Sequence, residues 1–520
     1  IGTQAGEGGQ GTSAVAIGPL AGQTGQNTNS IAMGTFAGCN AQGEGSVAIG
    51  QSTGRLGQGA GAVAIGEQAA NSAQGQQAIA IGKKAGASKQ GLSAVAIGNN
   101  AGRIWQNTYS VAIGNDAGEE GQGSNSVAIG YRAGCNAQDD YCVAIGKEAG
   151  EISQSINSVA IGRDAGNDSQ GEKSVAIGYL AGSNIQGGNN VAIGWKAGNT
   201  GQNNYSVAVG KWAGEIGQGQ RSVAIGELAG NREQGDEAVA IGKEAGEISQ
   251  GDNGVAIGPT AGNYMQGPQA VAIGTSAGET SQGDYSVAIG THAGTEGQNN
   301  FSVAIGYDAG RQGQGSTVAW TGSVAVGVSA GCNAQGADCV AIGKNAGRID
   351  QVSNGVAIGN SAGSNGQSNY SVAIGTEAGK LDQQEESIAI GYRSGCNTQG
   401  TSSVAIGYLA GSNTQGNQSV AIGMNAGATN QGDCAVAIGK YAGQTGQSDN
   451  SIVINASGSV VDGDALGGGC YIAPIRDADQ GSNLMMYNNT TKEVSYSDNP
   501  TVGGTITAGN AAIGSAYTGS

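Results

Sequence analysis

Short apolar segments recur along the chain at a constant spacing. The tetrad Ser-Val-Ala-Ile, or a close variant, precedes a glycine that recurs every sixteen residues from Gly2 to Gly306. After one step of twenty-one residues, the steps of sixteen resume and continue to Asn455. Written from its glycine, the unit is G-x-x-A-G-x-x-x-Q-G-x-x-S-V-A-I. The chain contains 28 such units, and five extra residues interrupt them within residues 316–322.

This unit predicts strands and turns, without helical periodicity. In Ser-Val-Ala-Ile, β-branched residues alternate with small ones, as is typical of a β-strand. The Ala-Gly and Gln-Gly pairs predict two turns, because glycine adopts backbone angles that other residues resist. Two short strands and two turns in sixteen residues predict one coil of a parallel β-roll or β-solenoid. With coils about 4.8 Å apart, the repeats would form a rod on the order of 130 Å long.

Both faces of the repeated strand are uncharged. Val and Ile point to one face, and Ser and Ala point to the other, because side chains alternate along a strand. A strand that is apolar or small on both faces is typically buried on both, and a thin roll has only one interior. The second face would otherwise expose far more apolar surface than the few hundred Å² that monomers tolerate. We therefore expect a homo-oligomer wound around a common axis.

Composition excludes several classes of protein. Glycine accounts for 101 of 520 residues and aromatic residues for only 4%, which is not the composition of an ordinary packed globular core. The net charge is −17 and no basic run occurs, so nucleic-acid binding is not expected. No apolar stretch approaches the roughly 18 residues of a membrane span. The chain begins with Ile1 and shows no signal peptide, so we expect a processed product.

A glutamine occupies the eighth position after the glycine in all 28 units. Its copies include Gln10, Gln26, Gln42, Gln106, Gln138 and Gln447. One interpretation is a polar ladder that binds sugar, ice or ions. The favoured one is structural: the amide lies in the turn and pairs with the backbone and with the glutamine of the next coil. Such a ladder satisfies polar groups that a tight coil would otherwise bury unpaired.

The cysteines allow two interpretations. Cys135 and Cys142 lie in one unit, and Cys332 and Cys339 occupy the same two positions in another. A matched pair that occurs twice suggests a disulfide across one coil, in an oxidising compartment. The alternative is a free thiol packed as a small apolar group. A zinc site is not expected, since His292 is the only histidine.

No catalytic constellation is visible, because the serines and carboxylates belong to the repeat or its loops. We therefore expect neither enzymatic activity nor a cofactor. Recognition would instead depend on the variable positions, where aromatic residues recur after the glycine. Rings on a rigid rod could stack on sugar rings, but the favoured interpretation is packing that covers the glycine-rich backbone. The candidates for surface recognition are Tyr131, Tyr179, Trp195, Tyr307, Tyr392 and Tyr408, with Trp320 in the insertion.

Three segments are predicted along the chain. Residues 1–455 form the β-roll, and 456–469 form a Gly- and Asp-rich linker. Residues 470–520 contain alternating runs separated by polar turn residues, followed by a polar tail. These runs predict a small antiparallel β module.

The Ser-Val-Ala-Ile-Gly units resemble the head repeats of trimeric autotransporter adhesins, the YadA-like left-handed parallel β-rolls. The period here is longer than is usual for that family, and the extra residues lie between the Ala-Gly and Gln-Gly pairs. The resemblance covers about residues 2–455. It implies a homotrimer with its Val-Ala-Ile strands toward the axis, and a role in adhesion to host surfaces.

The segment Cys-Tyr-Ile-Ala-Pro-Ile-Arg and the run after it are similar to a region that follows such repeats in fibre proteins of large algal viruses and tailed phages. We therefore expect an extracellular, trimeric, adhesin-like rod that projects from a virion or cell. Its partners would be glycans or proteins of a host surface, with no nucleic acid and no membrane insertion. The main alternative is a purely structural filament that polymerises end to end and has no receptor. An ice-binding solenoid is disfavoured because the turn positions are too varied, and a solenoid enzyme because the short coils leave no room for a groove.

Overall fold

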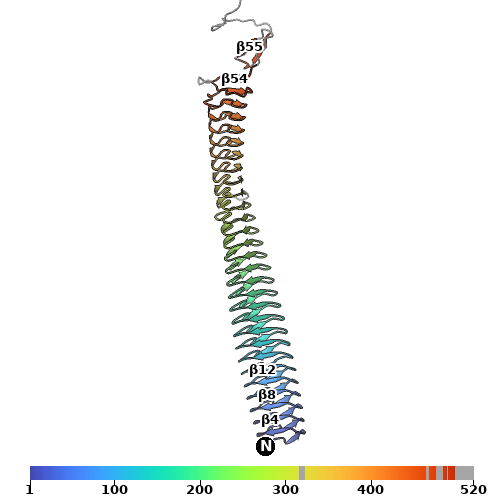
Figure 1. The fold of residues 1–520 in the computed structure, drawn as a ribbon. Coiled ribbons are helices and arrows are strands. Elements are labelled where there is room, and N and C mark those ends of the chain that lie inside the picture. Colours follow the sequence, from blue (N-terminus) through green and yellow to red (C-terminus); the bar gives the residue numbers. More distant parts are fainter. Residues whose placement is uncertain (316–321, 464–467, 476–483, 489, 493, 498–520) are drawn as a thin grey trace, which may run out of the picture. The chain divides into compact units, whose positions relative to one another are not determined.

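The chain is an all-β protein made of stacked coils. The computed structural model describes residues 1–315, 322–463, 468–475, 484–488, 490–492 and 494–497. It divides into two compact units, Ile1–Tyr471 and Ile472–Ser520. Figure 1 shows the first unit as a parallel β-solenoid with one coil per repeat. Every regular element in these ranges is a strand, and no helix there is long and apolar enough to cross a membrane.

One sheet of the solenoid, the V-A-I sheet, is built from the repeated apolar run. Each strand comprises the three residues before the marker glycine, from β2 (Val15–Ile17) to β52 (Val436–Ile438). The last strand, β53 (Ile452–Asn455), has four residues. Neighbouring strands pair in parallel, shifted by one repeat, so that Ala128 lies opposite Ala144. All-parallel pairing follows because the chain passes in the same direction through every coil.

The step of twenty-one residues does not disturb this register. Val303 pairs with Val324 and Ile305 with Val326, in the same order as in every other pair of coils. The V-A-I sheet therefore continues across the longer step. Residues 316–321, which include Trp320, lie outside the described residues.

The second sheet, the Gln sheet, runs parallel to the first along the other side of the coils. Each strand comprises the repeated glutamine and the two residues before it, from β1 (Gly8–Gln10) to β51 (Thr429–Gln431). It consists of segments of 6, 11 and 8 strands. At the two interruptions Ile104 and Glu296 still form single bridges to both neighbouring coils. The coil therefore closes in the same way at these points, with a shorter pairing.

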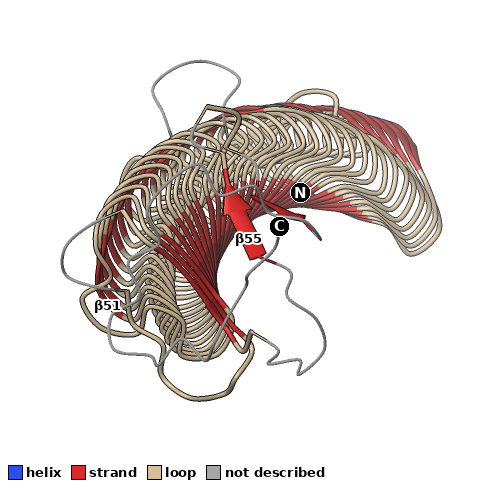
Figure 2. Ribbon diagram, turned by 90° about the horizontal axis from the view of Figure 1, so that it is seen from above, coloured by secondary structure: helices blue, strands red, loops and turns tan. Residues whose placement is uncertain are grey.

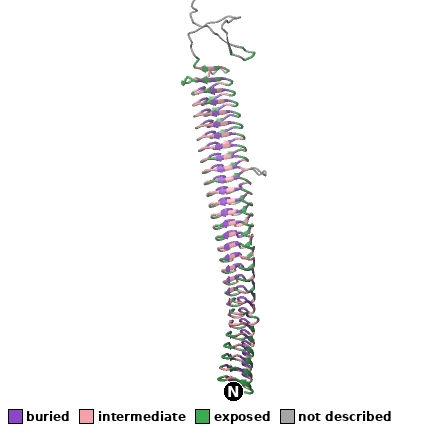
Figure 3. Cartoon of the chain, turned by 90° about the vertical axis from the view of Figure 1, so that its right-hand side faces the viewer, coloured by how far each residue is buried: buried purple, intermediate pink, exposed green. Residues whose placement is uncertain are grey.

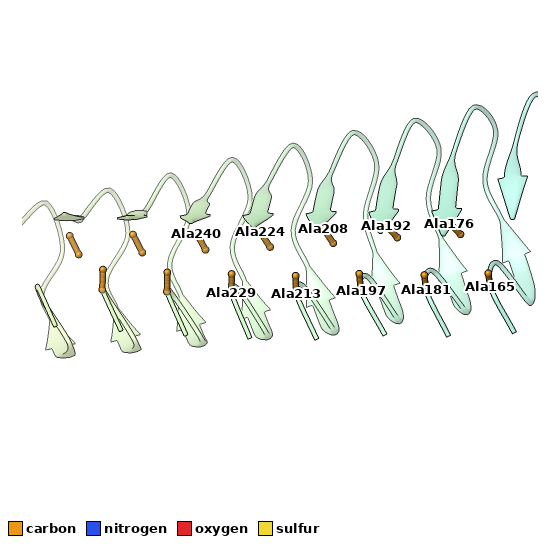
Figure 4. Close-up of a cluster of buried hydrophobic side chains, with 14 of the residues drawn as sticks. Ala165, Ala176, Ala181, Ala192, Ala197, Ala208, Ala213, Ala224, Ala229 and Ala240 are labelled. Atoms are coloured by element: carbon orange, nitrogen blue, oxygen red, sulfur yellow. The ribbon is translucent and has the colours of Figure 1, made fainter. Parts of the chain in front are cut away.

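The core between the sheets is made almost entirely of alanine. In nearly all coils, the central alanine of the V-A-I strand and the alanine of the Ala-Gly turn are buried and face each other in two rows. Figure 4 shows this arrangement, with Ala192 and Ala208 in one row and Ala197 and Ala213 in the other. The motif serine, such as Ser206, is buried as well. Because side chains alternate along a strand, an inward central alanine places the Val and Ile beside it on the outer face.

The coils of the first unit are rotated progressively along the stack. Seen from above in Figure 2, the strands of the V-A-I sheet line the concave side of the resulting arc, while the Gln sheet, with β51, lies on the outer side. In Figure 3 the buried residues form a continuous band along the stack, bordered by exposed turns. The apolar outer face of the V-A-I sheet is therefore turned toward the axis of the winding.

The last coil of the solenoid is covered by the residues that follow it. Val461 forms a parallel bridge with Ala442, and the amide of Gly443 donates to the Val461 carbonyl at 2.7 Å. The amide of Ile452 donates to Gly469, and Tyr471 packs against the alanine core. Part of the segment expected to be a linker, 456–469, is thus folded onto the solenoid. Asn455 starts this cap, since its Nδ2 donates to the carbonyls of Lys440 and Ser459.

Two further pieces of secondary structure follow. β54 (Cys470–Ala473) spans the boundary between the two units. In the second unit, β55 (Leu484–Tyr487) pairs in antiparallel fashion with β56 (Val494–Ser497). The expected antiparallel pairing within 470–520 is therefore present in this hairpin.

Candidate functional site: the exposed strand face and the aromatic rows

The outer face of the V-A-I sheet is an uninterrupted apolar stripe. Its isoleucines are about one-third exposed, for example 37% at Ile193 and 39% at Ile225, and the valines beside them are half-buried. One Val and one Ile, or a close relative, are added by every coil. Monomeric proteins rarely expose apolar patches above roughly 300–600 Å². A stripe that gains residues in every coil is therefore a candidate interaction surface.

The repeated glutamine lies inside the coil, at the end of a Gln-sheet strand and not in a turn. Gln138 Nε2 donates to the Val127 carbonyl at 3.1 Å and to Gln154 Oε1 at 2.9 Å. Its own Oε1 accepts from Gln122 Nε2 at 3.2 Å. The side chain thus ties the two sheets together and links three successive coils.

The other copies of this glutamine follow the pattern to different degrees. Gln106 and Gln447 are buried, bond to the V-A-I sheet and accept from the preceding glutamine. Gln26 and Gln42 donate only to backbone carbonyls. Gln10, in the first coil, is exposed and bonds only to Ala14. The glutamine row therefore has no free face for a ligand, and its geometry is that of internal support.

Replacing Gln138 with leucine is expected to destabilise the solenoid by roughly 2–4 kcal/mol, because three buried polar partners lose their hydrogen bonds. Gln10→Leu provides the matched control, because the same side chain is exposed there and makes one local bond. Thermal unfolding followed by circular dichroism compares the two. If both substitutions lowered the stability equally, the buried glutamine row would not contribute to the stability of the solenoid.

The disulfides expected between Cys135 and Cys142 and between Cys332 and Cys339 are not present. All eight cysteines are free thiols. Cys135 Sγ donates toward Glu119 of the preceding coil at 3.7 Å, whereas Cys142 Sγ donates to the Ser155 carbonyl of the following coil at 2.9 Å. The second cysteine replaces the motif serine and makes the serine's inward bond, so its sulfur points away from the first. The alternative interpretation, in which the cysteines are free thiols packed as small apolar groups, therefore applies to both cysteine-containing units.

Burial changes the chemistry of these thiols. Desolvation raises the pKa of Cys135, Cys142 and Cys339 to about 11, although hydrogen bonds partly offset it. Only the thiolate reacts with alkylating reagents, so these groups are shielded by both charge and burial. Cys434, by contrast, is exposed to solvent.

Iodoacetamide at pH 8 is therefore expected to label Cys434 in the folded protein at least tenfold faster than Cys142 or Cys339. Since the raised pKa keeps the buried thiols protonated, their labelling should accelerate only as the pH approaches 11. Mass spectrometry of tryptic peptides provides the readout. All eight cysteines should be labelled in protein that is unfolded without a reductant. If two cysteines of one unit stayed unlabelled under these conditions, a disulfide between them would be present after all.

The aromatic residues after the marker glycine lie exposed along one edge of the solenoid. Tyr131, Tyr179, Trp195, Tyr307, Tyr392 and Tyr408 are 40–52% exposed. Their surroundings differ. Tyr392 and Tyr408 stack on each other, with ring centres 5.3 Å apart and planes 13° apart, and Tyr307 lies beside His292. In the stacked pair, each ring covers one face of the other.

Tyr179 and Trp195 belong to a different arrangement. Their ring centres are 6.3 Å apart, and Trp195 is 5.5 Å from Trp212, with planes tilted by 55° and 41°. Lys211 Nζ lies 3.9 Å from the Trp212 ring centre, and Arg163 lies 5.4 Å from that of Tyr179. We call Tyr179, Trp195 and Trp212 the three-ring patch. Trp212 is not among the recognition residues predicted from the sequence, because it lies seventeen residues after Trp195, which is one coil on and one position along.

The described residues offer no metal centre. No three His, Cys, Asp or Glu side chains among them come together in a way that could hold a metal ion. His292 Nδ1 lies 3.2 Å from Asp308 Oδ1 in the next coil, on the surface of the solenoid. This pair is one of several cross-coil contacts between residues sixteen apart.

The fold and its surfaces define the chain as a parallel β-solenoid with an exposed apolar strand face. Comparison with family models identifies the repeats more narrowly: the model described as YadA head domain repeat (2 copies) matches residues 26–53, 73–101, 266–293, 281–309 and 399–426. The matched coils are similar to YadA head repeats. No curated protein and no solved structure matches the chain.

Proposed function

We propose that this protein is a homotrimeric, extracellular fibre that projects from a virion or cell and contacts a host surface. The observation that carries the proposal is the apolar stripe of the V-A-I sheet. Three chains wound around one axis would bury that stripe, which already lies on the concave side of the winding in Figure 2. YadA-type repeats, which occur in trimeric adhesins, support the same assembly.

The proposed role is mechanical and adhesive, without catalysis. The sheets pair coil to coil over the whole solenoid, and the glutamine ladder adds a second line of hydrogen bonds inside it. Such a body is stiff and presents its variable turn residues outward at fixed spacing. Its repeats and its core of alanine favour a structural protein over an enzyme.

The cap on the last coil favours a discrete fibre over an end-to-end filament. An uncovered terminal coil would present the unpaired edges of both sheets, which is the geometry that lets solenoids join. Here Val461 and Gly469 occupy backbone partners of the last coil, and Tyr471 covers its core. A second solenoid would have to displace these residues before it could stack on this end.

Electron microscopy of the protein in its native source tests the proposal. Discrete three-chain rods attached to a particle or cell are the expected result. Rods joined end to end into long polymers would overturn it and make the protein a structural filament. In solution, sedimentation should give about 152 kDa, three times the chain mass of 50.6 kDa.

A further inference from the structure

The three-ring patch is held rigidly on the surface of the solenoid. The amide of Lys196 donates to the Tyr179 carbonyl and the amide of Trp212 to the Trp195 carbonyl, both at 2.8 Å. The three rings therefore occupy successive coils, and the backbone ladder fixes their order along the rod. A ligand would bind a preformed surface, so the entropic cost of ordering the binding residues would be small.

No two rings of this patch stack face to face. Tyr285 and Phe301 are stacked with planes only 6° apart, and Tyr392 and Tyr408 with planes 13° apart, so each ring in these pairs hides a face of its partner. In the three-ring patch the tilts of 55° and 41° prevent such mutual covering. Trp195 remains 48% exposed. Cations lie over all three rings: Arg163 is 5.4 Å from the Tyr179 ring centre, and Lys211 Nζ is 5.6 Å from that of Trp195 and 3.9 Å from that of Trp212. These cations are side chains at the surface, and that of Lys211 is 38% exposed.

Polar groups border the rings in neutral pairs. Lys196 Nζ lies 3.1 Å from Glu215, and Lys211 Nζ lies 3.0 Å from Glu227. Each pair offers both a hydrogen-bond donor and an acceptor without a net charge. A border of this kind suits hydroxyl groups, which donate and accept equally, better than it suits a charged ligand.

We infer that the three-ring patch, Tyr179, Trp195 and Trp212, binds an extended neutral glycan, of which a β-1,4-linked chain is the simplest form. Sugar rings combine apolar C–H faces with polar hydroxyl edges, which matches aromatic faces bordered by donor–acceptor pairs. The ligand must be extended because the rings follow the rod over three coils. A nucleic acid, whose bases could also stack, is excluded by the net charge of −17.

This inference rests on the proposed function, because it names the chemistry by which the fibre would contact a surface. The patch is separate from the apolar stripe: its residues lie in the turn after the V-A-I strand and not on the strand. Burial of the stripe between chains therefore does not require burial of the rings. A second copy of the chain is nevertheless the other occupant to test.

Calorimetric titration of the full-length protein with cellohexaose and with chitohexaose tests the site. Binding of at least one is expected, and Trp195→Ala or Trp212→Ala should weaken it roughly two- to tenfold. Tyr408→Ala is the matched control, since it removes an equally exposed ring from a stacked pair, and it should leave the affinity unchanged. Sedimentation of each variant accompanies the titrations.

Three results would overturn the inference: no binding of either hexaose, equal weakening by Tyr408→Ala, or loss of the trimer mass in the tryptophan variants. The last would assign the patch to a chain–chain contact. A trimer that binds no hexaose would remove only the glycan site. A monomer that binds through the tryptophans would keep the site and remove the proposed trimer.

Discussion

Gly146→Ala is expected to disrupt the solenoid at one coil and to cost about 3 kcal/mol or more in stability. Gly146 is a marker glycine with a φ of +134°, a backbone region that other residues rarely enter. A Cβ atom built there would lie 2.5 Å from the Gly162 carbonyl oxygen of the next coil. The atom it meets belongs to the backbone ladder, so neither coil can yield without breaking pairing.

Gly121→Ala is the control for this substitution. Gly121 also has a positive φ, of +70°, but an added Cβ would meet nothing closer than 3.8 Å. The next coil already places Ala137 in this position with a φ of 57°. Limited proteolysis and thermal unfolding should show a new cleavage region near residue 146 in the first variant only. Equal stability of the two variants would contradict a steric role for the marker glycine.

Placing carboxylates on the apolar stripe should have the second large effect. In a trimer of the double variant Ile193→Asp/Ile225→Asp, six carboxylates would face the axis. Each charge removed from water costs several kcal/mol. Sedimentation at pH 8 should therefore shift from about 152 kDa toward the chain mass of 50.6 kDa. Ile216→Asp, on the Gln sheet and 44% exposed, should leave the mass unchanged.

The effect should depend on pH in a defined direction. Burial raises the pKa of the introduced carboxyls in the trimer above their value of about 4 in the free chain. The trimer is then fully stabilised below pH 4 and weakens as the pH rises through the raised pKa. Recovery of the trimer mass at pH 4 would support the axial position of the stripe, and an unchanged mass at both pH values would contradict it.

Much of the fold could be predicted from the period of the chain. Two short strands per unit, one of them the Ser-Val-Ala-Ile run, follow from the sixteen-residue spacing, because a unit so short admits only strands and turns. The continuation of the register past the insertion could also be predicted, and the structure pairs Val303 with Val324. The predicted position of the glutamine in a turn is wrong, because the residue is the last one of a Gln-sheet strand. The sequence shows only that a glycine often follows it.

The residues of the three-ring patch could not be assembled from the sequence. Trp195 and Trp212 lie seventeen residues apart, and only the pitch of one coil makes them neighbours at 5.5 Å. The sequence equally does not distinguish them from Tyr392 and Tyr408, which occupy similar positions but stack on each other. Ring orientation depends on the neighbouring side chains, such as Lys211, and not on the repeat.

The sequence by itself determined the repeat, the alternation of the strand and the presence of two uncharged faces, because these are properties of local spacing. The tertiary structure decided which face is inside: a coil this thin closes around alanine methyls, so Val and Ile face outward. It also left the thiols unpaired, since Cys135 and Cys142 point to opposite neighbouring coils. Finally, it folded residues after Asn455 onto the last coil, a contact that depends on the end of the stack and not on any local pattern.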